Sequence, residues 1–178
     1  MFMYKFIYSK ILKWTVFGEF PKALNQYVVI AAPHTHWHDL HMGLILRKVT
    51  NTAINFVAKK ELFIWPLGWY LRKVGGIALD RTSGQKSVDA YAQLFKKHPD
   101  FILNIAPEGT RKKVSEWKTG FYYIAKKANV PIVMVAFDYE HKKHIISKPF
   151  YQTNDVEADF KFMQSFFEGI VGKVPEYS

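Results

Sequence analysis

The sequence contains no cysteine. Disulfide bonds, thiolate zinc sites and a cysteine nucleophile are therefore excluded. It also lacks an uncharged apolar run of about 18 residues, the length that a membrane-spanning helix requires. Three lysines interrupt the apolar N-terminus, which argues against a secretory signal. Internal repeats and low-complexity tracts are missing too, so we expect residues 1–178 to form a single domain.

Acidic residues are scarce relative to basic ones. The chain has 15 Asp and Glu against 25 Lys and Arg, which gives a formal net charge of +10. Such a surface favours an anionic partner: nucleic acid, a membrane surface, or an acidic carrier or substrate. An RNP-type aromatic strand or a basic recognition helix is not evident, so we expect no nucleic acid.

What is present is a regular alternation of strands and helices. Hydrophobic residues make up 49% of the chain, as expected for a globular protein. Periodicity predicts an α/β fold in which a mostly parallel or mixed sheet is flanked by helices, with an N-terminal amphipathic helix. The expected strands are 27–32, 51–58, 75–81, 101–107, 130–137 and an edge strand within 142–150; the expected helices are 2–16, 37–49, 82–97, 119–129 and about 157–170.

Two apolar segments have more than one interpretation. The helix 2–16 has a wide aromatic face and a lysine stripe, so residues 1–17 could lie in a membrane interface or dock on the protein's own domain. Residues 62–71 include two tryptophans and a tyrosine. They could form an apolar wall, an interfacial patch or part of the core.

The clearest candidate for a catalytic site follows the strand 27–32. This strand ends at Pro33, and His34 and Asp39 come directly after it. A spacing of five places two residues about 140° apart on a helix, so the two meet only if His34 lies on the turn and Asp39 in the first helical turn. A histidine oriented by a carboxylate can accept a proton from a hydroxyl group. We therefore predict a catalytic dyad of His34 and Asp39.

Two alternatives compete for the same stretch. It could be a helix start with surface histidines. It could also be the metal site of a metal-dependent hydrolase built from His34, His36, His38 and Asp39, because His-x-His-x-His-Asp is similar to the His-x-His-x-Asp-His of the metallo-β-lactamase family, with the last two residues exchanged. We favour the dyad and expect no metal.

Two further strands end in charged residues. Asp80-Arg81 follows one, and Glu108 and Arg111 follow the other. Parallel neighbouring strands would bring these groups to one edge of the sheet beside the dyad. Arginine binds phosphate with a planar fork, and Gly109 allows a tight turn whose N–H groups could help to hold an anion. The alternatives are a surface ion pair for Asp80-Arg81 and a loop-pinning salt bridge between Glu108 and Arg111.

Four blocks in register now carry a resemblance. His34-x4-Asp39, Gly76-x4-Arg81, Pro107-Glu-Gly-Thr-Arg111 and Val130-Pro-Ile-Val133 resemble, in order and spacing, the blocks of the glycerolipid acyltransferase family, typified by lysophosphatidate acyltransferases. The resemblance runs from about Tyr27 to Phe137. It departs from the usual pattern at Pro33, His36 and Lys112.

The resemblance implies transfer of a fatty acyl group from an acyl-CoA or acyl carrier protein to a lysolipid hydroxyl. The acceptor would be lysophosphatidate by default, with a lyso-aminolipid as the alternative. His34 would be the base and Asp39 its orienter, and the substrate would be bound by Arg81, Glu108, Gly109, Thr110 and Arg111. A thioester is already activated, so no cofactor is expected. The basic chain would lie peripherally on an anionic membrane surface, at the cytoplasmic face of the cell membrane.

Overall fold

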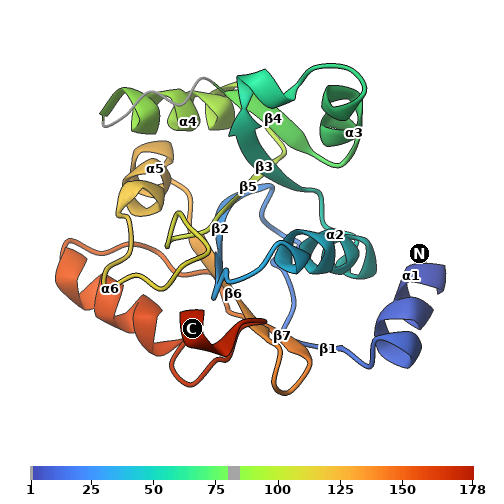
Figure 1. The fold of residues 1–178 in the computed structure, drawn as a ribbon. Coiled ribbons are helices and arrows are strands. Elements are labelled where there is room, and N and C mark those ends of the chain that lie inside the picture. Colours follow the sequence, from blue (N-terminus) through green and yellow to red (C-terminus); the bar gives the residue numbers. More distant parts are fainter. Residues whose placement is uncertain (1, 80–84) are drawn as a thin grey trace.

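The computed structural model describes residues 2–79 and 85–178, and within them it forms a seven-stranded sheet with helices on both faces (Figure 1). The predicted α/β class is therefore confirmed. The strand order is β1-β7-β6-β2-β5-β3-β4. The strands are β1 (Thr15–Phe17), β2 (Gln26–Ala32), β3 (Ile54–Lys59), β4 (Gly76–Leu79), β5 (Phe101–Ile105), β6 (Ile132–Asp138) and β7 (Lys143–Ile146).

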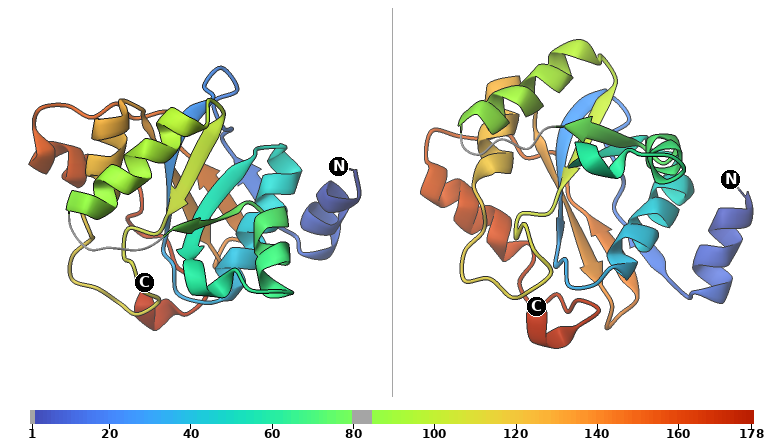
Figure 2. Two further views of the ribbon diagram at one scale, coloured as in Figure 1. Left: turned by 90° about the horizontal axis from the view of Figure 1, so that it is seen from above. Right: turned by 45° about the horizontal axis from the view of Figure 1, so that its top comes forward.

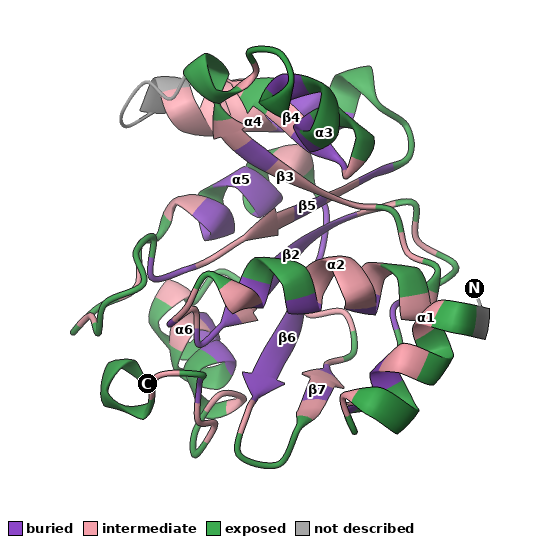
Figure 3. Ribbon diagram, turned by 45° about the vertical axis from the view of Figure 1, so that its right-hand side comes forward, coloured by how far each residue is buried: buried purple, intermediate pink, exposed green. Residues whose placement is uncertain are grey.

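The sheet is mixed. Strands β6, β2, β5, β3 and β4 are mutually parallel, whereas β7 runs antiparallel to β6 and β1 runs parallel to β7. Every residue of β6 is buried (Figure 3), as expected for a strand covered on both faces. All five parallel strands point their carboxyl ends to one edge of the sheet, which we call the carboxyl edge.

Each face of the sheet has its own helical layer (Figure 2). One layer holds α4 (Gln85–Lys97), α5 (Gly120–Ala128) and α6 (Val156–Ser165), which pack on a core that includes Phe121, Tyr122 and Met163. The other holds α1 (Phe2–Phe6), α2 (His38–Thr50) and α3 (Leu67–Lys73). Short helical turns complete the chain at η1 (Ile7–Ile11), η2 (Lys60–Leu62) and η3 (Pro175–Tyr177).

The N-terminal segment differs from the predicted continuous helix 2–16. The α-helical turn of α1 passes into a π-helical turn at η1 and ends at Ile11, and Thr15–Phe17 then adds a strand to the sheet. Tyr8 and Trp14 are buried in the core beneath α2. Trp14 and Ile11 therefore do not share one face, as the single amphipathic helix predicted, because Trp14 is buried and Ile11 is exposed. Aromatic contacts across the fold decide its position, and helical periodicity cannot report these.

Residues 62–71 do not form one continuous helix, because Pro66 cannot continue one. The chain turns through η2 and a short loop, and α3 begins after Pro66. Most of the large side chains of this segment are exposed, so it is not a core element. None of the helices in the described ranges combines the length and apolar character needed to cross a bilayer.

Candidate active site

The predicted pair of His34 and Asp39 comes together at the carboxyl edge. Pro33 ends β2, His34 lies on the connecting turn, and Asp39 lies in the first turn of α2. The His34 Nδ1 atom is 3.0 Å from Asp39 Oδ2. The His34 side chain keeps 26% of its surface exposed while that of Asp39 keeps 3%. The imidazole can thus reach a bound molecule, and the carboxylate lies behind it.

Asp39 is fixed by further hydrogen bonds from its surroundings. The backbone N–H groups of Thr35 and His36 both donate to Oδ2 at 2.9 Å. On the other oxygen, the hydroxyl of Tyr139 donates to Oδ1 at 2.7 Å. Burial alone would raise the pKa of Asp39, but the donors from His34, His36 and Tyr139 outweigh it and hold that pKa below its ordinary value. The carboxylate is therefore ionised and can only accept.

The tautomer of His34 follows from this arrangement. Because Asp39 offers only acceptor atoms, the proton between the two side chains belongs to Nδ1 of His34. The other ring nitrogen, Nε2, then carries a free lone pair. A neutral imidazole in this tautomer, on a side chain that is 26% exposed, is what a general base for a hydroxyl group requires.

Glu108 lies beside the dyad, and its carboxylate holds the turn that carries His34. Its carboxylate is buried and accepts hydrogen bonds from the backbone N–H of His34, at 2.9 Å to Oε2 and 3.2 Å to Oε1. Burial raises the pKa of Glu108, with a further contribution from the charge of Asp39. Glu108 thus pins the turn that presents His34. The suggested salt bridge with Arg111 is not formed, although both residues are described.

The turn after β5 presents positive charge. Gly109 has φ +66°, a left-handed conformation that a side chain would strain, so the expected tight turn is present. Its own N–H is not free for an anion, because it donates to the carbonyl of Ala106 at 3.1 Å. Beyond it, Thr110 and Arg111 are exposed, as are Lys112, Lys113 and Lys118. Neighbouring strands β2 and β5 place this basic turn beside the dyad.

Arg81 lies outside the described residues. For the metal hypothesis, no group of three or more His, Asp or Glu side chains within the described ranges is arranged to hold a metal ion. Asp39 is turned toward His34 and Tyr139 instead of the rings of His36 and His38, so the sequence pattern does not form a ligand set.

Tyr139 is the part of the site that the sequence argument missed. It follows β6 directly, so it reaches the carboxyl edge for the same reason as His34 and Glu108. Its position directly after a predicted buried strand is the sequence feature from which Tyr139 could have been predicted. A second unpredicted contact ties the turn to the C-terminal segment, where the backbone N–H of Val174 donates to the Thr35 hydroxyl at 3.1 Å.

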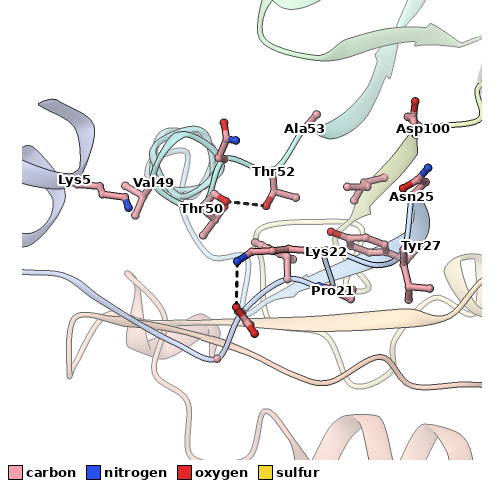
Figure 4. A pocket seen from close by; sticks show the side chains of 16 residues that line it. Lys5, Pro21, Lys22, Asn25, Tyr27, Val49, Thr50, Thr52, Ala53 and Asp100 are labelled. Carbon is pink, nitrogen blue, oxygen red and sulfur yellow. Dashed lines mark hydrogen bonds and ion pairs between the residues drawn. The ribbon is translucent and has the colours of Figure 1, made fainter. Parts of the chain in front are cut away.

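A separate hollow lies away from the dyad. It has a volume of about 610 Å³ and is lined by residues including Lys5, Lys22, Asn25, Thr52 and Asp100 (Figure 4). These positions surround the amino ends of β2 and β5, the opposite edge of the sheet from the dyad. None of the candidate catalytic residues lines this hollow. The candidate active site is therefore at the carboxyl edge and not in this hollow.

Comparison with known proteins gives three findings. The profile of the family described as Acyltransferase matches residues 14–138. The 1-acyl-sn-glycerol-3-phosphate acyltransferase of Saccharomyces cerevisiae is 32% identical over 128 residues, covering 67% of this chain and 41% of that protein. The chain thus spans about two fifths of the length of this curated relative. The crystal structure of the 1-acyl-sn-glycerophosphate (LPA) acyltransferase PlsC from Thermotoga maritima superposes with a TM-score of 0.61 at 22% identity, covering 92% of this chain and 75% of that one, which establishes similarity of fold.

Proposed function

The chain belongs to the acyltransferase family, and we propose that it transfers a fatty acyl group from an acyl thioester to the hydroxyl of a lysolipid. Lysophosphatidate is the acceptor that we propose, since the yeast relative bears the name of a 1-acyl-sn-glycerol-3-phosphate acyltransferase. The donor would be an acyl-CoA or an acyl carrier protein, and no cofactor would be needed. The single observation that carries the proposal is the accessible His34 ring held 3.0 Å from the buried, ionised Asp39.

The reaction follows from the state of these two groups. Nε2 of His34 removes the proton of the acceptor hydroxyl, and the oxygen attacks the carbonyl carbon of the thioester. The carbon–sulfur bond then breaks, and the thiolate receives the proton from His34. Asp39 keeps the imidazole oriented and stabilises the positive charge that forms on it between these steps. One ester is gained, one thioester is lost, and His34 is regenerated.

Positive charge near the dyad suits an acceptor that carries phosphate. The turn from Gly109 to Lys118 contains four basic residues and one acidic residue, and Arg111 is exposed on it. Arginine can form two parallel hydrogen bonds to a phosphate group. We propose that Arg111, with Thr110 beside it and Arg81 from the segment after β4, binds the acceptor head group. The protein would work peripherally at the cytoplasmic face of the cell membrane.

The test is to replace the proposed base and measure turnover. His34→Ala should lower kcat by about 10² to 10⁴ when lysophosphatidate is the acceptor and acyl-CoA or acyl carrier protein is the donor. His41→Ala, which removes an exposed ring two residues beyond Asp39 on α2, is the matched control and should retain activity. A His34→Ala protein that is folded and turns over at the wild-type rate would contradict the proposed mechanism. Comparing lysophosphatidate with a lyso-aminolipid in the same assay identifies the acceptor.

A further inference from the structure

The loop and helix that follow β3 carry an unusual concentration of exposed apolar side chains, which we call the 62–70 patch. Trp65 is 86% exposed, Ile64 67% and Trp69 60%. Three smaller contributions complete the patch: Leu62, Leu67 and Tyr70. Single exposed apolar residues are normal on a protein surface, but a contiguous group of this size marks an interaction site.

The patch is presented by a tight turn. Gly68 is buried, and a Cβ at this position would lie 2.3 Å from the backbone carbonyl of Phe63. Only glycine therefore allows α3 to fold back so closely on the loop. The N–H of Gly68 donates to the carbonyl of Ile64, which closes the turn with Ile64 and Trp65 on its outer side. The large apolar side chains at 62, 64, 65, 67, 69 and 70 are all exposed on this turn.

Cations surround the patch. Lys59 and Lys60 precede it and Arg72 and Lys73 follow it, all four exposed, whereas Glu61 is the one acidic residue between 59 and 73. Two of the cations lie on aromatic faces: Arg72 is 5.4 Å from the ring centre of Phe63, and Lys73 is 4.8 Å from that of Trp69. Tryptophan and tyrosine with adjacent lysine and arginine are the residues that hold proteins at the boundary between lipid and water.

The position of the patch relates it to the active site. β3 is parallel to β5, and β5 is parallel to β2, so the chain leaves β3 at the carboxyl edge where His34 lies. Only β5 separates β3 from β2, which corresponds to about 10 Å between their axes. α3 and α2 also cover the same face of the sheet (Figure 2). At the start of α2, beside the dyad, Trp37 and Leu40 are exposed as well.

We propose that the 62–70 patch inserts into the acyl region of an anionic bilayer and holds the carboxyl edge at the membrane surface. The partner is a lipid surface because the patch joins an apolar centre to a cationic rim, and phosphate head groups complement that rim. The inference rests on the proposed function in one respect, namely that a site placed there would receive a lipid acceptor. It assigns membrane contact to this segment and not to α1. The residues that follow α1 anchor it to the protein, because Tyr8 and Trp14 are buried there.

The experiment measures binding and activity separately on the full chain. Binding is measured by flotation with vesicles of equal parts phosphatidylcholine and phosphatidylglycerol. The double variant Ile64→Ser/Trp65→Ser should bind about tenfold more weakly or worse, because two inserted side chains are lost. Lys60→Gln should weaken binding by about fivefold and make it less dependent on salt. Phe17→Ser, an equally exposed apolar residue (73%) on the far edge strand β1, is the control and should bind as wild type.

Outcomes separate this inference from the proposed function. Wild-type binding by Ile64→Ser/Trp65→Ser would overturn the inference, as would loss of binding in Phe6→Ser/Ile11→Ser alone, which would place the contact on the N-terminal segment. A change from dimer to monomer without a change in vesicle binding would show that a second copy covers the patch, and would also overturn it. Activity on a short-chain, water-soluble lysophosphatidate should be unchanged in the double variant. The remaining outcome is that neither wild type nor any variant is active on any acceptor, but vesicle binding is still lost in the patch variants. The proposed function then fails and the inference stands.

Discussion

Asp39 shows how a single carboxylate can organise a site. It receives two backbone N–H groups, one imidazole and one phenol, from residues as near as His36 and as far as Tyr139. Tyr139 donates to Oδ1, whereas the other three donors reach Oδ2. Burial and the adjacent Asp39 charge both raise the pKa of Tyr139, so its hydroxyl stays protonated and acts only as a donor to Asp39. It is a positioning residue that acts through Asp39.

Tyr139→Phe tests this role. Without the hydroxyl, Oδ1 of a buried carboxylate loses its donor, and Asp39 can rotate away from His34. We expect kcat to fall by about tenfold while the KM for the acceptor changes little, because an interaction with an ionised group is worth about 1.5–3 kcal/mol. Steady-state kinetics with varied acceptor concentration measures both constants.

A matched control is available on the other face of the sheet. The buried hydroxyl of Tyr122 donates to Asp159 at 2.8 Å, so Tyr122→Phe removes the same kind of bond away from the dyad. Tyr122→Phe should lower the free energy of unfolding about as much as Tyr139→Phe does, but it should leave kcat unchanged. Equal kcat losses in both variants would mean that Tyr139 contributes only stability.

At the scale of elements, the N-terminal segment belongs to the domain. The Tyr8 hydroxyl donates to the carbonyl of Thr15 at 2.9 Å and shares a 2.6 Å hydrogen bond with Nδ1 of His144. Trp14 packs edge-on against Tyr139, with ring centres 4.9 Å apart. The segment therefore supports the tyrosine that supports Asp39. Of the two interpretations left open by the sequence, docking on the protein's own domain is the one that the contacts favour.

Trp14→Ala should therefore lower the free energy of unfolding by about 3–5 kcal/mol, the usual cost of removing a buried aromatic side chain. Ile11→Ala removes a side chain that is 61% exposed and should change it by less than about 0.5 kcal/mol. Urea denaturation followed by circular dichroism measures both. Deletion of residues 1–16 should abolish cooperative unfolding. A truncated protein with wild-type stability would show that the segment is only an appendage.

For the molecule as a whole, a buried titratable side chain, His144, makes the free energy of unfolding depend on pH. His144 is fully buried among Tyr8, Trp14 and Phe137, and no hydrogen-bond partner within the described residues reaches its Nε2. Burial lowers the pKa of His144 from 6.5 to about 3, slightly opposed by the charge of Asp39. The folded protein therefore holds this ring neutral, whereas the unfolded chain protonates it near pH 6.5.

The sign of the effect follows from these two values. Stability from His144 is complete above pH 6.5 and is lost as pH falls toward 3, because the unfolded state then binds the extra proton. Between pH 7 and pH 5 the loss from this group is about 2 kcal/mol. Glu108 acts in the opposite direction, since its raised pKa means that protonation stabilises the fold.

His144→Gln isolates the histidine, because glutamine has similar volume, can bond to Tyr8 and does not titrate. Its free energy of unfolding should fall less than that of wild type between pH 7 and pH 5, by about 2 kcal/mol. Urea titrations at both pH values give this difference directly. Parallel pH dependence in the two proteins would mean that His144 is not the group responsible.

Although β1 and α3 were not predicted, most of the alternation of strands and helices, and the pairing of His34 with Asp39 beyond the end of β2, follow from properties of the sequence alone. These are local properties: hydrophobic periodicity, a proline that ends a strand, and two residues five apart. Other features could not be predicted from the sequence: Tyr139 donates to Asp39, Glu108 accepts from the backbone of His34, Trp14 is buried and Trp65 is exposed. Each of these depends on contacts or exposure set by segments distant in the sequence. A tryptophan can therefore be buried in the core or exposed on the surface, depending on which segments of the fold cover it.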